Sequence, residues 1–471
     1  MNESSKHIFS IAILSLGLLI LLSAMPWSRL TGNVIKDFNL FEDLFPDEQA
    51  TMNSSIPSDP ELGMLAQEGI PSESPIEPVP AAVADSAATD SVEPEPEIII
   101  AKEAPVRDGI VLIENYTGSE KPFARFREAI AEASSRTVRI AVIGDSYIEG
   151  DIFCQDLRSL LQQRYGGSGV GFMAMHSDFP GFRKTVRQSD SGWEMHDIRN
   201  LGRRDSLRTL SGDYAKAASH ATAKFTATSA LHGNESWDVT RFVFLAPDSG
   251  TITMTTADGL AQEFAIQPSG EVQSVAMAGN AKGVTITSDI NGLVGLGVYL
   301  DANSGVQVDC MSVRGNSGLA LRSIRSKLCR QMAQWADYDL IILEFGMNAI
   351  SPEQTDYSPY AAAMVDAVAH VRSCYPKADI LVMGVGDRGH KEGAVVQSMN
   401  AAKGMQAAQR KLAHKAKTLF WDTRSAMGGD GSIADWRKRR LVNADYIHLN
   451  HAGGAELATL FDNALQIALN E

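Results

Sequence analysis

The stretch VRIAVIGDSYIEGD, residues 138–151, decides the fold that we expect for this chain. Its first half is rich in β-branched apolar residues and predicts a buried strand that ends at Gly144. Residues 148–163 carry apolar side chains at helical spacing and predict an amphipathic helix. Ser146 therefore lies at a turn from a strand into a helix, at the carboxyl edge of a sheet.

Two interpretations of Ser146 are open from this stretch alone. Free N–H groups at a helix N-terminus favour negative charge, so a serine there suits a nucleophile whose attack creates an oxyanion. Asp and Ser after a strand are also common helix caps, and capping explains Asp145 and Ser146 without any chemistry. Catalysis is favoured only if the rest of the chain offers a general base and oxyanion donors for this serine.

The charge of the chain is concentrated in one segment. The net charge is −15 over 471 residues, but residues 31–105 alone hold 16 acidic residues and only two lysines. The same segment holds ten of the 18 prolines, which predicts an acidic, disordered linker over residues 31–106. The remainder is nearly neutral and lacks the basic footprint of a nucleic-acid binder, so we expect no nucleic-acid partner.

Residues 8–25 form a continuous apolar run without a charged side chain. Its 18 residues are just enough to span a bilayer as a helix. We expect an uncleaved transmembrane anchor within residues 1–30, with a cleaved signal peptide as the alternative. Leu22 and Ala24 match a small-x-small cleavage site poorly, which favours the anchor. The flanking charges do not decide the orientation; the function argued below places the rest on the periplasmic or extracellular face.

Two α/β regions flank a region of different character. Residues 107–176 and 310–471 alternate buried strands with helices, which is typical of a three-layer α/β/α fold around a doubly wound, mainly parallel sheet. Residues 177–309 hold short Thr-, Val- and Phe-rich runs, which predict an inserted β-sandwich that could bind carbohydrate. Its aromatic residues could stack on sugars or pack in the core; they are Trp193, Tyr214, Trp237 and Tyr299.

Neither the cysteines nor the glycine-rich stretch predicts a cofactor. The four cysteines are not at metal-ligand spacing, so we expect no metal and interpret most of them as small buried residues. The stretch YGGSGVGF at 165–172 lacks the Lys and Ser/Thr of a phosphate-binding loop and predicts a flexible loop.

A possible catalytic constellation is spread over four blocks. His448 could take the proton of Ser146 as a general base, and Asp445 could hold the imidazole through Nδ1. A backbone N–H at Gly318 and the side-chain amide of Asn348 could bind an oxyanion together with the N–H of the serine. Each block alone is commonly structural, but four of them in order, three directly after predicted strand ends, favour catalysis.

The blocks resemble those of the SGNH (GDSL-like) hydrolase superfamily. The matching pieces are GDSYIEGD, NSG, GMN and DYIHLNHAG, within about residues 138–172 and 306–469. Residues 144–172 are more narrowly similar to the start of bacterial peptidoglycan O-acetylesterases, which also carry a β-sandwich inserted after this block. The chain departs from the family pattern at Tyr147 and Ala349.

The resemblance implies an acetyl ester on a polysaccharide as substrate and a Ser-His-Asp mechanism without metal or cofactor. It implies these roles: Ser146 as nucleophile, His448 as base, Asp445 as the residue that orients it, and Gly318 and Asn348 as oxyanion donors. Gly315 fits the glycine block loosely as well, and we choose Gly318 because it directly precedes the next predicted helix.

Three functions remain open at this point. If water resolves the acetyl-enzyme, the protein is an esterase. If a sugar hydroxyl does so, the protein is a polysaccharide O-acetyltransferase. A membrane-bound acetyl-transfer partner could then deliver acetyl groups to it. A third alternative is an inactive carbohydrate-binding scaffold, which the intact blocks disfavour. We expect the esterase, because the catalytic geometry is shared and only the binding of the acceptor differs.

Overall fold

The computed structural model describes residues 103–198, 206–392 and 395–471, and every structural statement below concerns these residues. The predicted anchor at 1–30 lies outside them, as does the predicted linker as far as residue 102. No helix within the described ranges combines the length and apolar composition that a bilayer-spanning helix needs.

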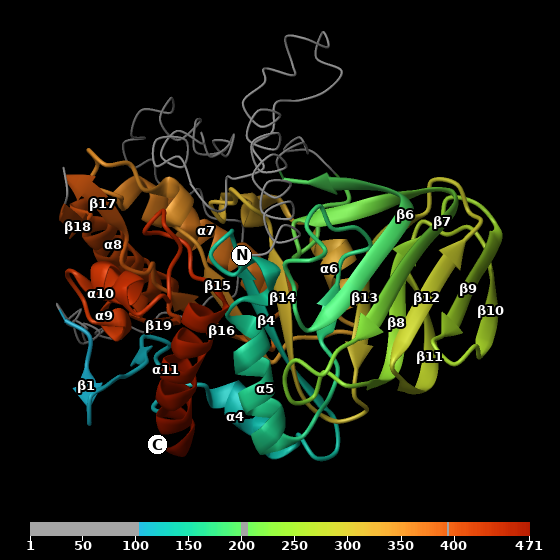
Figure 1. Cartoon of the computed structure of the whole chain (residues 1–471), viewed down its shortest axis with the longest axis horizontal. Coiled ribbons are helices and arrows are strands. Elements are labelled where there is room, and N and C mark those ends of the chain that lie inside the picture. The colour runs from blue at the N-terminus through green and yellow to red at the C-terminus, as the bar shows by residue number, and fades with distance from the viewer. Residues whose placement is uncertain (1–102, 199–205, 393–394) are drawn as a thin grey trace, which may run out of the picture. The chain divides into compact units, whose positions relative to one another are not determined.

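A six-stranded sheet forms the centre of the α/β part, in the order β14-β4-β15-β16-β19-β3 (Figure 1). Five strands are parallel, and β3 is antiparallel to β19 at one edge. The strands are β3 (Glu114–Asn115), β4 (Thr137–Gly144), β14 (Gly305–Ser312), β15 (Leu340–Glu344), β16 (Asp379–Met383) and β19 (Leu419–Trp421). The structure thus confirms the predicted α/β class with a mainly parallel sheet.

The order of the parallel strands fixes where a ligand can bind. Counted along the chain it is 2-1-3-4-5, the flavodoxin-like order, in which ligands bind where the winding direction switches. Here the switch lies between β4 and β15, so their carboxyl ends form the expected site. β4 is buried from Val138 onward because helices cover both faces of the sheet. Burial of each Ile or Val side chain in this strand stabilises the folded state by about 1.5–3 kcal/mol.

Helices α4 (Ala124–Ala131), α5 (Cys154–Tyr165) and α11 (His451–Asn470) lie in front of the sheet in the view of Figure 1. The α4 side chain Arg127 donates to the carbonyl oxygens of Ala468 and Leu469, which ties α4 to the end of α11. Helices α6 (Ser326–Met332), α7 (Ser358–Cys374) and α8 (Asn400–Ala416) form the crossovers on the other side of the switch. Since such crossovers are right-handed, they cover the opposite face.

The helix predicted over 148–163 is interrupted at its start. A short 3₁₀ turn, η1 (Glu149–Asp151), precedes α5, which begins only at Cys154. Gly150 has φ +71° and Asp151 has φ +68°, so both residues take a left-handed conformation that a continuous α-helix excludes. The prediction missed this break because Asp in the first turn of a helix is otherwise favourable.

The inserted region is antiparallel, as predicted, but its strands form one barrel-like sheet rather than two separate ones. The order is β10-β9-β12-β7-β13-β8-β11, with β5 paired to β13 and β6 paired to β7. The strands are β5 (Gly171–Met173), β6 (Val186–Asp197), β7 (Asp213–Ala227), β8 (Trp237–Leu245), β9 (Gly250–Thr256), β10 (Ala261–Ile266), β11 (Gln273–Ala281), β12 (Gly283–Ser288) and β13 (Val294–Asp301). Long β7 pairs with three strands, which lets the sheet curl.

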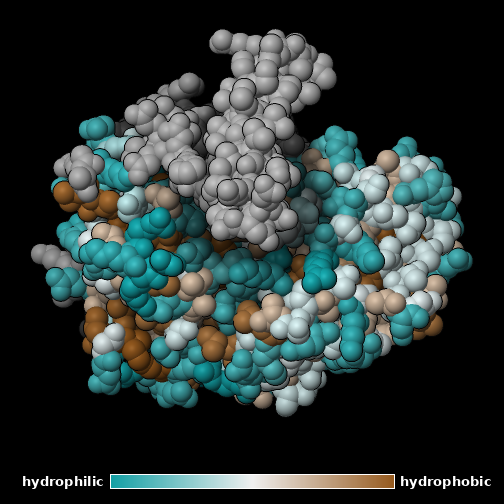
Figure 2. All heavy atoms as spheres, viewed as in Figure 1, coloured by the Kyte–Doolittle hydropathy of each residue, from teal (hydrophilic) through white to brown (hydrophobic). Residues whose placement is uncertain are grey.

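The aromatic residues that were candidates for stacking on sugars are all buried: Trp193, Tyr214, Trp237 and Tyr299. They pack in the cores, so sugar stacking by these side chains is excluded in this structure. The outer surface over the inserted sheet, at the right of Figure 2, is mainly polar or of intermediate hydropathy. The four cysteines are also buried, and none forms a disulfide in the structure.

The remaining elements are short. Two antiparallel hairpins are β1 (Val106–Arg107) with β2 (Ile110–Val111), and β17 (Gly389–Glu392) with β18 (Val395–Ser398). Two 3₁₀ turns, η2 (Leu319–Ser323) and η3 (Met347–Ala349), follow β14 and β15, and helices α9 (Thr423–Met427) and α10 (Ser432–Lys438) follow β19. The 3₁₀ turns matter most here, because they begin at the edge of the sheet where Ser146 lies.

Candidate active site

The turn after β4 presents Ser146 at the switch point of the sheet. Asp145 is fully buried, and its Oδ1 accepts the backbone N–H of Tyr147 at 2.8 Å, which braces the turn. Burial raises the pKa of Asp145 to about 6, although the hydrogen bond from Tyr147 opposes this. Ser146 itself is half-buried, and within the described ranges its N–H has no hydrogen-bond acceptor. The turn therefore offers a hydroxyl and a donor on the same residue.

The structure brings together the three residues predicted as nucleophile, base and orienting group. Ser146 Oγ lies 2.9 Å from His448 Nε2, and His448 Nδ1 lies 2.7 Å from Asp445 Oδ2. The other carboxylate oxygen of Asp445 accepts the backbone N–H groups of Ile447 and His448, at 2.9 and 3.1 Å. Asp445 thus orients the loop and the imidazole together. This is the arrangement in which a histidine can take a proton from a serine hydroxyl.

The electrostatics of the pair suit a general base. Burial alone would lower the pKa of His448, but the hydrogen bond and the charge of Asp445 outweigh it, so that the pKa is raised. Burial would raise the pKa of Asp445, but the hydrogen bond and charge of His448 outweigh it and the pKa is lowered. Asp445 is therefore ionised at neutral pH and keeps a proton on Nδ1. Nε2 then faces the serine as the acceptor.

Close packing of α11 fixes the position of His448. The side chain of Asn450 caps α11 by accepting the N–H of Gly453 at 3.1 Å. A Cβ at Gly454 would lie only 1.9 Å from the carbonyl oxygen of Ile152, so glycine is required for the helix to approach this backbone. The N–H of Asn443 donates to the carbonyl oxygen of His448 at 2.8 Å, which closes the loop that carries His448.

Asn348 lies beside the turn, but its amide is already engaged. Its Nδ2 donates to Asp145 Oδ2 at 2.7 Å and to the carbonyl oxygen of Asn316 at 3.1 Å. Asn348 therefore ties the end of β15 to the Ser146 turn and to the loop after β14. In this arrangement neither amide hydrogen is free to bind an oxyanion.

Gly318 holds the conformation of its loop rather than offering a donor. Its N–H donates to Asn316 Oδ1 at 2.8 Å, its φ is +87°, and a Cβ there would lie 2.8 Å from the Phe345 ring. Gly315 also has a positive φ of +80°, and its N–H has no acceptor within the described parts of the chain. Sequence spacing could not separate the two glycines, because the side chain of Asn316 decides which N–H is free.

Two charged residues near the site were not singled out from the sequence. Arg314, whose guanidinium forms an ion pair with Glu149, opposes the rise in the pKa of His448. The same two residues line a hollow of about 160 Å³ between the α/β part and the inserted sheet. Phe179 and Phe182 also line this hollow and are partly exposed. The signal that could have found Arg314 is its place directly before the glycine block.

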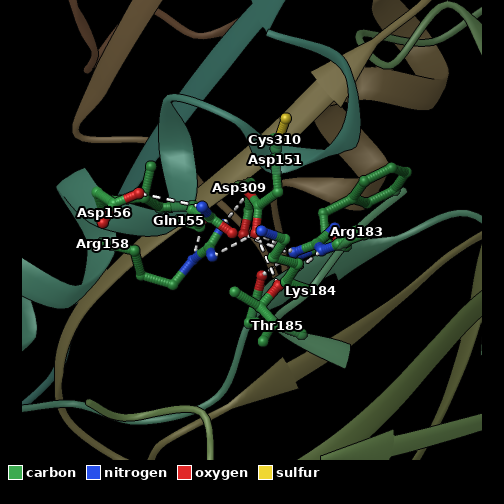
Figure 3. A network of polar contacts seen from close by, with 12 residues as sticks. Asp151, Gln155, Asp156, Arg158, Arg183, Lys184, Thr185, Asp309 and Cys310 are labelled. Atoms are coloured by element: carbon green, nitrogen blue, oxygen red, sulfur yellow. Dashed lines mark hydrogen bonds and ion pairs between the residues drawn. The ribbon is translucent and has the colours of Figure 1, made fainter. Parts of the chain in front are cut away.

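One cluster has the residue types of a metal site. Asp151, Cys154 and Cys310 place potential ligand atoms within 4.8 Å of one another. However, Arg158 donates to both carboxylate oxygens of Asp151 at 2.8 Å, and Arg183 lies 3.1 Å from it (Figure 3). Two guanidinium groups already neutralise this carboxylate and would repel a cation, so the cluster fits a structural ion-pair network.

The comparisons with known proteins agree with this geometry. Residues 283–455 match the model of the GDSL-like Lipase/Acylhydrolase family. A solved structure described as "Peptidoglycan O-acetylesterase in action, 5 min" is 24% identical, with a TM-score of 0.63, over 76% of this chain and 99% of that one. This likeness shows the shared fold. A search of curated proteins gives no significant match.

Two further solved structures are more distant. A putative GDSL-like lipase from Parabacteroides merdae is 16% identical, with a TM-score of 0.28, over 34% of this chain and 74% of that one. A family two carbohydrate esterase from Cellvibrio japonicus is 10% identical, with a TM-score of 0.23, over 61% and 98%. At such TM-scores the likeness carries no weight.

The family match contains the predicted base but not the predicted nucleophile. Asp445 and His448 lie within residues 283–455, whereas Ser146 comes before the inserted sheet. The pairing of β14 with β4, in register from Gly305 opposite Thr137 to the ends of both strands, brings the two pieces together. The parallel pairing of β15 with β4 joins the two pieces as well, so β4 connects the parts of the chain before and after the insertion on both of its sides.

Proposed function

We propose that this chain, whose residues 283–455 match the model of the GDSL-like lipase/acylhydrolase family, is a serine esterase that removes O-acetyl groups from a cell-envelope polysaccharide such as peptidoglycan. The family match confirms the predicted resemblance to SGNH hydrolases. The observation that carries the proposal is the hydrogen-bonded series Ser146–His448–Asp445 at the switch point of the sheet. The acetylated glycan as substrate is supported by the likeness to a peptidoglycan O-acetylesterase.

The proposed reaction follows from the positions of Ser146 Oγ and His448 Nε2. His448 Nε2 takes the proton of Ser146 Oγ as the oxygen attacks the acetyl carbonyl. When the tetrahedral intermediate collapses, the sugar oxygen leaves with the proton held on Nε2, and the acetyl group stays on the serine. A water molecule then gives a proton to the same nitrogen and attacks the acetyl-serine. Acetate leaves, and the serine oxygen recovers the proton.

We assign the oxyanion donors from the N–H groups that remain free. The N–H of Ser146 is one, and the N–H of Gly315 is the other, in place of the predicted Gly318. Asn348 joins them if its amide turns away from the carbonyl oxygen of Asn316 and keeps its bond to Asp145. Each such donor lowers the barrier by about 2.7–4 kcal/mol in serine hydrolases.

We also propose where the enzyme works. The apolar run at 8–25 suits a membrane anchor, and the acidic, proline-rich segment after it suits a tether. An enzyme held in this way reaches a polysaccharide outside the cytoplasm. A membrane-bound acetyl-transfer partner would be needed only if the acceptor were a sugar.

Product analysis tests the esterase directly. With O-acetylated peptidoglycan, we expect the enzyme to release free acetate at a rate that added oligosaccharide does not reduce. The reason is that nothing in the mechanism requires a sugar acceptor once the acetyl-serine has formed. Acetate is measured by coupled assay, and the oligosaccharide by mass spectrometry, with enzyme lacking the Ser146 hydroxyl as the blank. A gain of about 42 Da on the oligosaccharide (one acetyl group in place of a hydrogen atom), at the expense of acetate, would identify a transferase instead.

A further inference from the structure

A groove of about 1100 Å³ runs along one corner of the inserted sheet. Its walls are residues 180–188, which lead into β6, residues 226–230 at the end of β7, and Lys282 before β12. The Oγ1 of Thr228 donates to the carbonyl oxygen of Lys184 at 2.9 Å, so these walls are joined by hydrogen bonds.

The groove is cationic. Lys184, Arg187 and Lys282 are exposed, and none of them forms an ion pair within the described parts of the chain. Arg187 stands opposite Thr226 in the β6–β7 pairing, and the carbonyl oxygen of Lys282 accepts the N–H of Ala227 at 2.9 Å. All three cations therefore flank the last residues of β7.

Few acidic groups face these cations. One acidic side chain, Glu235, is found among the described residues that line the groove. Several other exposed cations of the α/β part, such as Arg107 and Arg439, lie against carboxylates. Three positive charges that form no ion pair within the described residues, gathered in one concave surface, favour an anionic ligand.

The groove leads toward the proposed ester site. Pro180, Arg183 and Gln188 line both the groove and the 160 Å³ hollow that Glu149 and Arg314 border. The Phe182 ring lies 5.9 Å from the ring of His451, which stands three residues after the base. Burial and then the charge of Lys184 lower the pKa of His451, which places the lysine near the same helix end.

The Asp151 network holds the groove in a fixed relation to the catalytic turn. Thr185 donates to Asp151 Oδ2 at 2.9 Å, and Arg183 donates to the carbonyl oxygen of Val170 at 3.0 Å. Figure 3 shows Asp151 between Arg158 from α5 and Arg183 from the groove wall. Because Asp151 and Arg158 are fully buried, their bidentate pair is a rigid anchor rather than a surface contact.

We propose that this groove binds a carboxylate-bearing stretch of the same polysaccharide strand whose acetyl ester is hydrolysed at Ser146. The proposal rests on the esterase function above. An extended acidic glycan fits a groove that shares wall residues with the hollow beside the proposed ester site, whereas a flat anionic membrane would not follow it. Salt screens binding by exposed cations. Such binding retains the enzyme on the polymer and takes no part in the hydrolysis of the ester.

Charge reversal at the groove tests the proposal. In full-length protein, the triple variant Lys184→Glu, Arg187→Glu, Lys282→Glu should bind insoluble acetylated peptidoglycan at least about tenfold more weakly at low salt. Binding of the wild type should fall as salt rises, and that of the variant should change little. Hydrolysis of the polymer, expressed relative to hydrolysis of p-nitrophenyl acetate by the same preparation, should fall through a higher KM.

A matched control removes the effect of net charge. Lys121→Glu, Lys411→Glu, Lys415→Glu changes the charge equally at exposed positions of the α/β part. Equal losses in both variants, or wild-type binding by the groove variant, would overturn the proposal, as would a groove-dependent preference for anionic vesicles over the glycan. Groove-dependent binding of the glycan without release of acetate would uphold the groove and refute the esterase. Thermal midpoints check that the variants are folded.

Discussion

Replacing Ser146 by alanine is expected to lower kcat for p-nitrophenyl acetate by about 10⁴-fold or more, because loss of the nucleophile leaves only binding and the oxyanion donors. The hydroxyl lies 2.9 Å from His448 Nε2, and within the described parts of the chain no other serine hydroxyl is hydrogen-bonded to a histidine. The fold should be retained, because the side chain is half-buried and its one hydrogen bond is to the base. Initial rates and the thermal midpoint measure the two effects separately.

Ser135→Ala is the matched control for this variant. Ser135 is exposed, and its hydroxyl bonds only to the carbonyl oxygen of Glu132 at 2.9 Å. Wild-type turnover is therefore expected from it. Turnover by Ser146→Ala above one tenth of the wild-type rate would place the nucleophile elsewhere.

Replacing Asp445 by asparagine should lower kcat by about 10⁴-fold, since an asparagine amide can donate to Nδ1 and leave the proton on Nε2, facing the serine. The pH profile should move as well. In the wild type, kcat/KM rises as pH increases through the raised pKa of His448, because only the neutral imidazole accepts a proton. Without the carboxylate that raises this pKa, the acid limb should move to lower pH.

Asp435→Asn provides the comparison for this second variant. Asp435 is an exposed residue of α10 that pairs with Lys438. The Asp435→Asn variant should therefore keep the rate and the pH profile of the wild type. A near wild-type rate for Asp445→Asn, or an acid limb at an unchanged pH, would show that Asp445 does not orient the base.

The parts of the site that local sequence rules determine were predictable. The β-branched run of β4 buries itself in a parallel sheet, and the turn after it follows directly. The spacing of Asp445 and His448 is equally local, because one carboxylate oxygen accepts the backbone N–H groups of the same loop. These features need no knowledge of distant contacts.

The remaining features depend on contacts between distant segments. Whether the N–H of Gly315 or of Gly318 is free is decided by the side chain of Asn316. That Asn348 binds Asp145 becomes visible only when β15 and β4 lie side by side. The curl of the inserted sheet likewise arises from β7 pairing with three partners, which alternation of residues along single strands does not reveal.

The groove could not be predicted from the sequence for the same reason. Lys184 and Arg187 come from one segment, while Lys282 is almost a hundred residues later in the chain. Lys282 directly precedes β12, and the pairing of β12 with β7 brings it beside the other two. Counts of charged residues along the chain show only that the sequence outside residues 31–105 is nearly neutral. The local excess of positive charge exists only after the strands have paired.

Covalent labelling tests most directly whether Ser146 is the nucleophile. A fluorophosphonate should modify the full-length protein at one site, and peptide mass spectrometry should locate the adduct on Ser146, with acetylated substrate slowing the reaction. The Ser146→Ala variant should stay unmodified under the same conditions. A wild-type protein that does not react would be an inactive scaffold, and an adduct on another serine would contradict the assignment of the site.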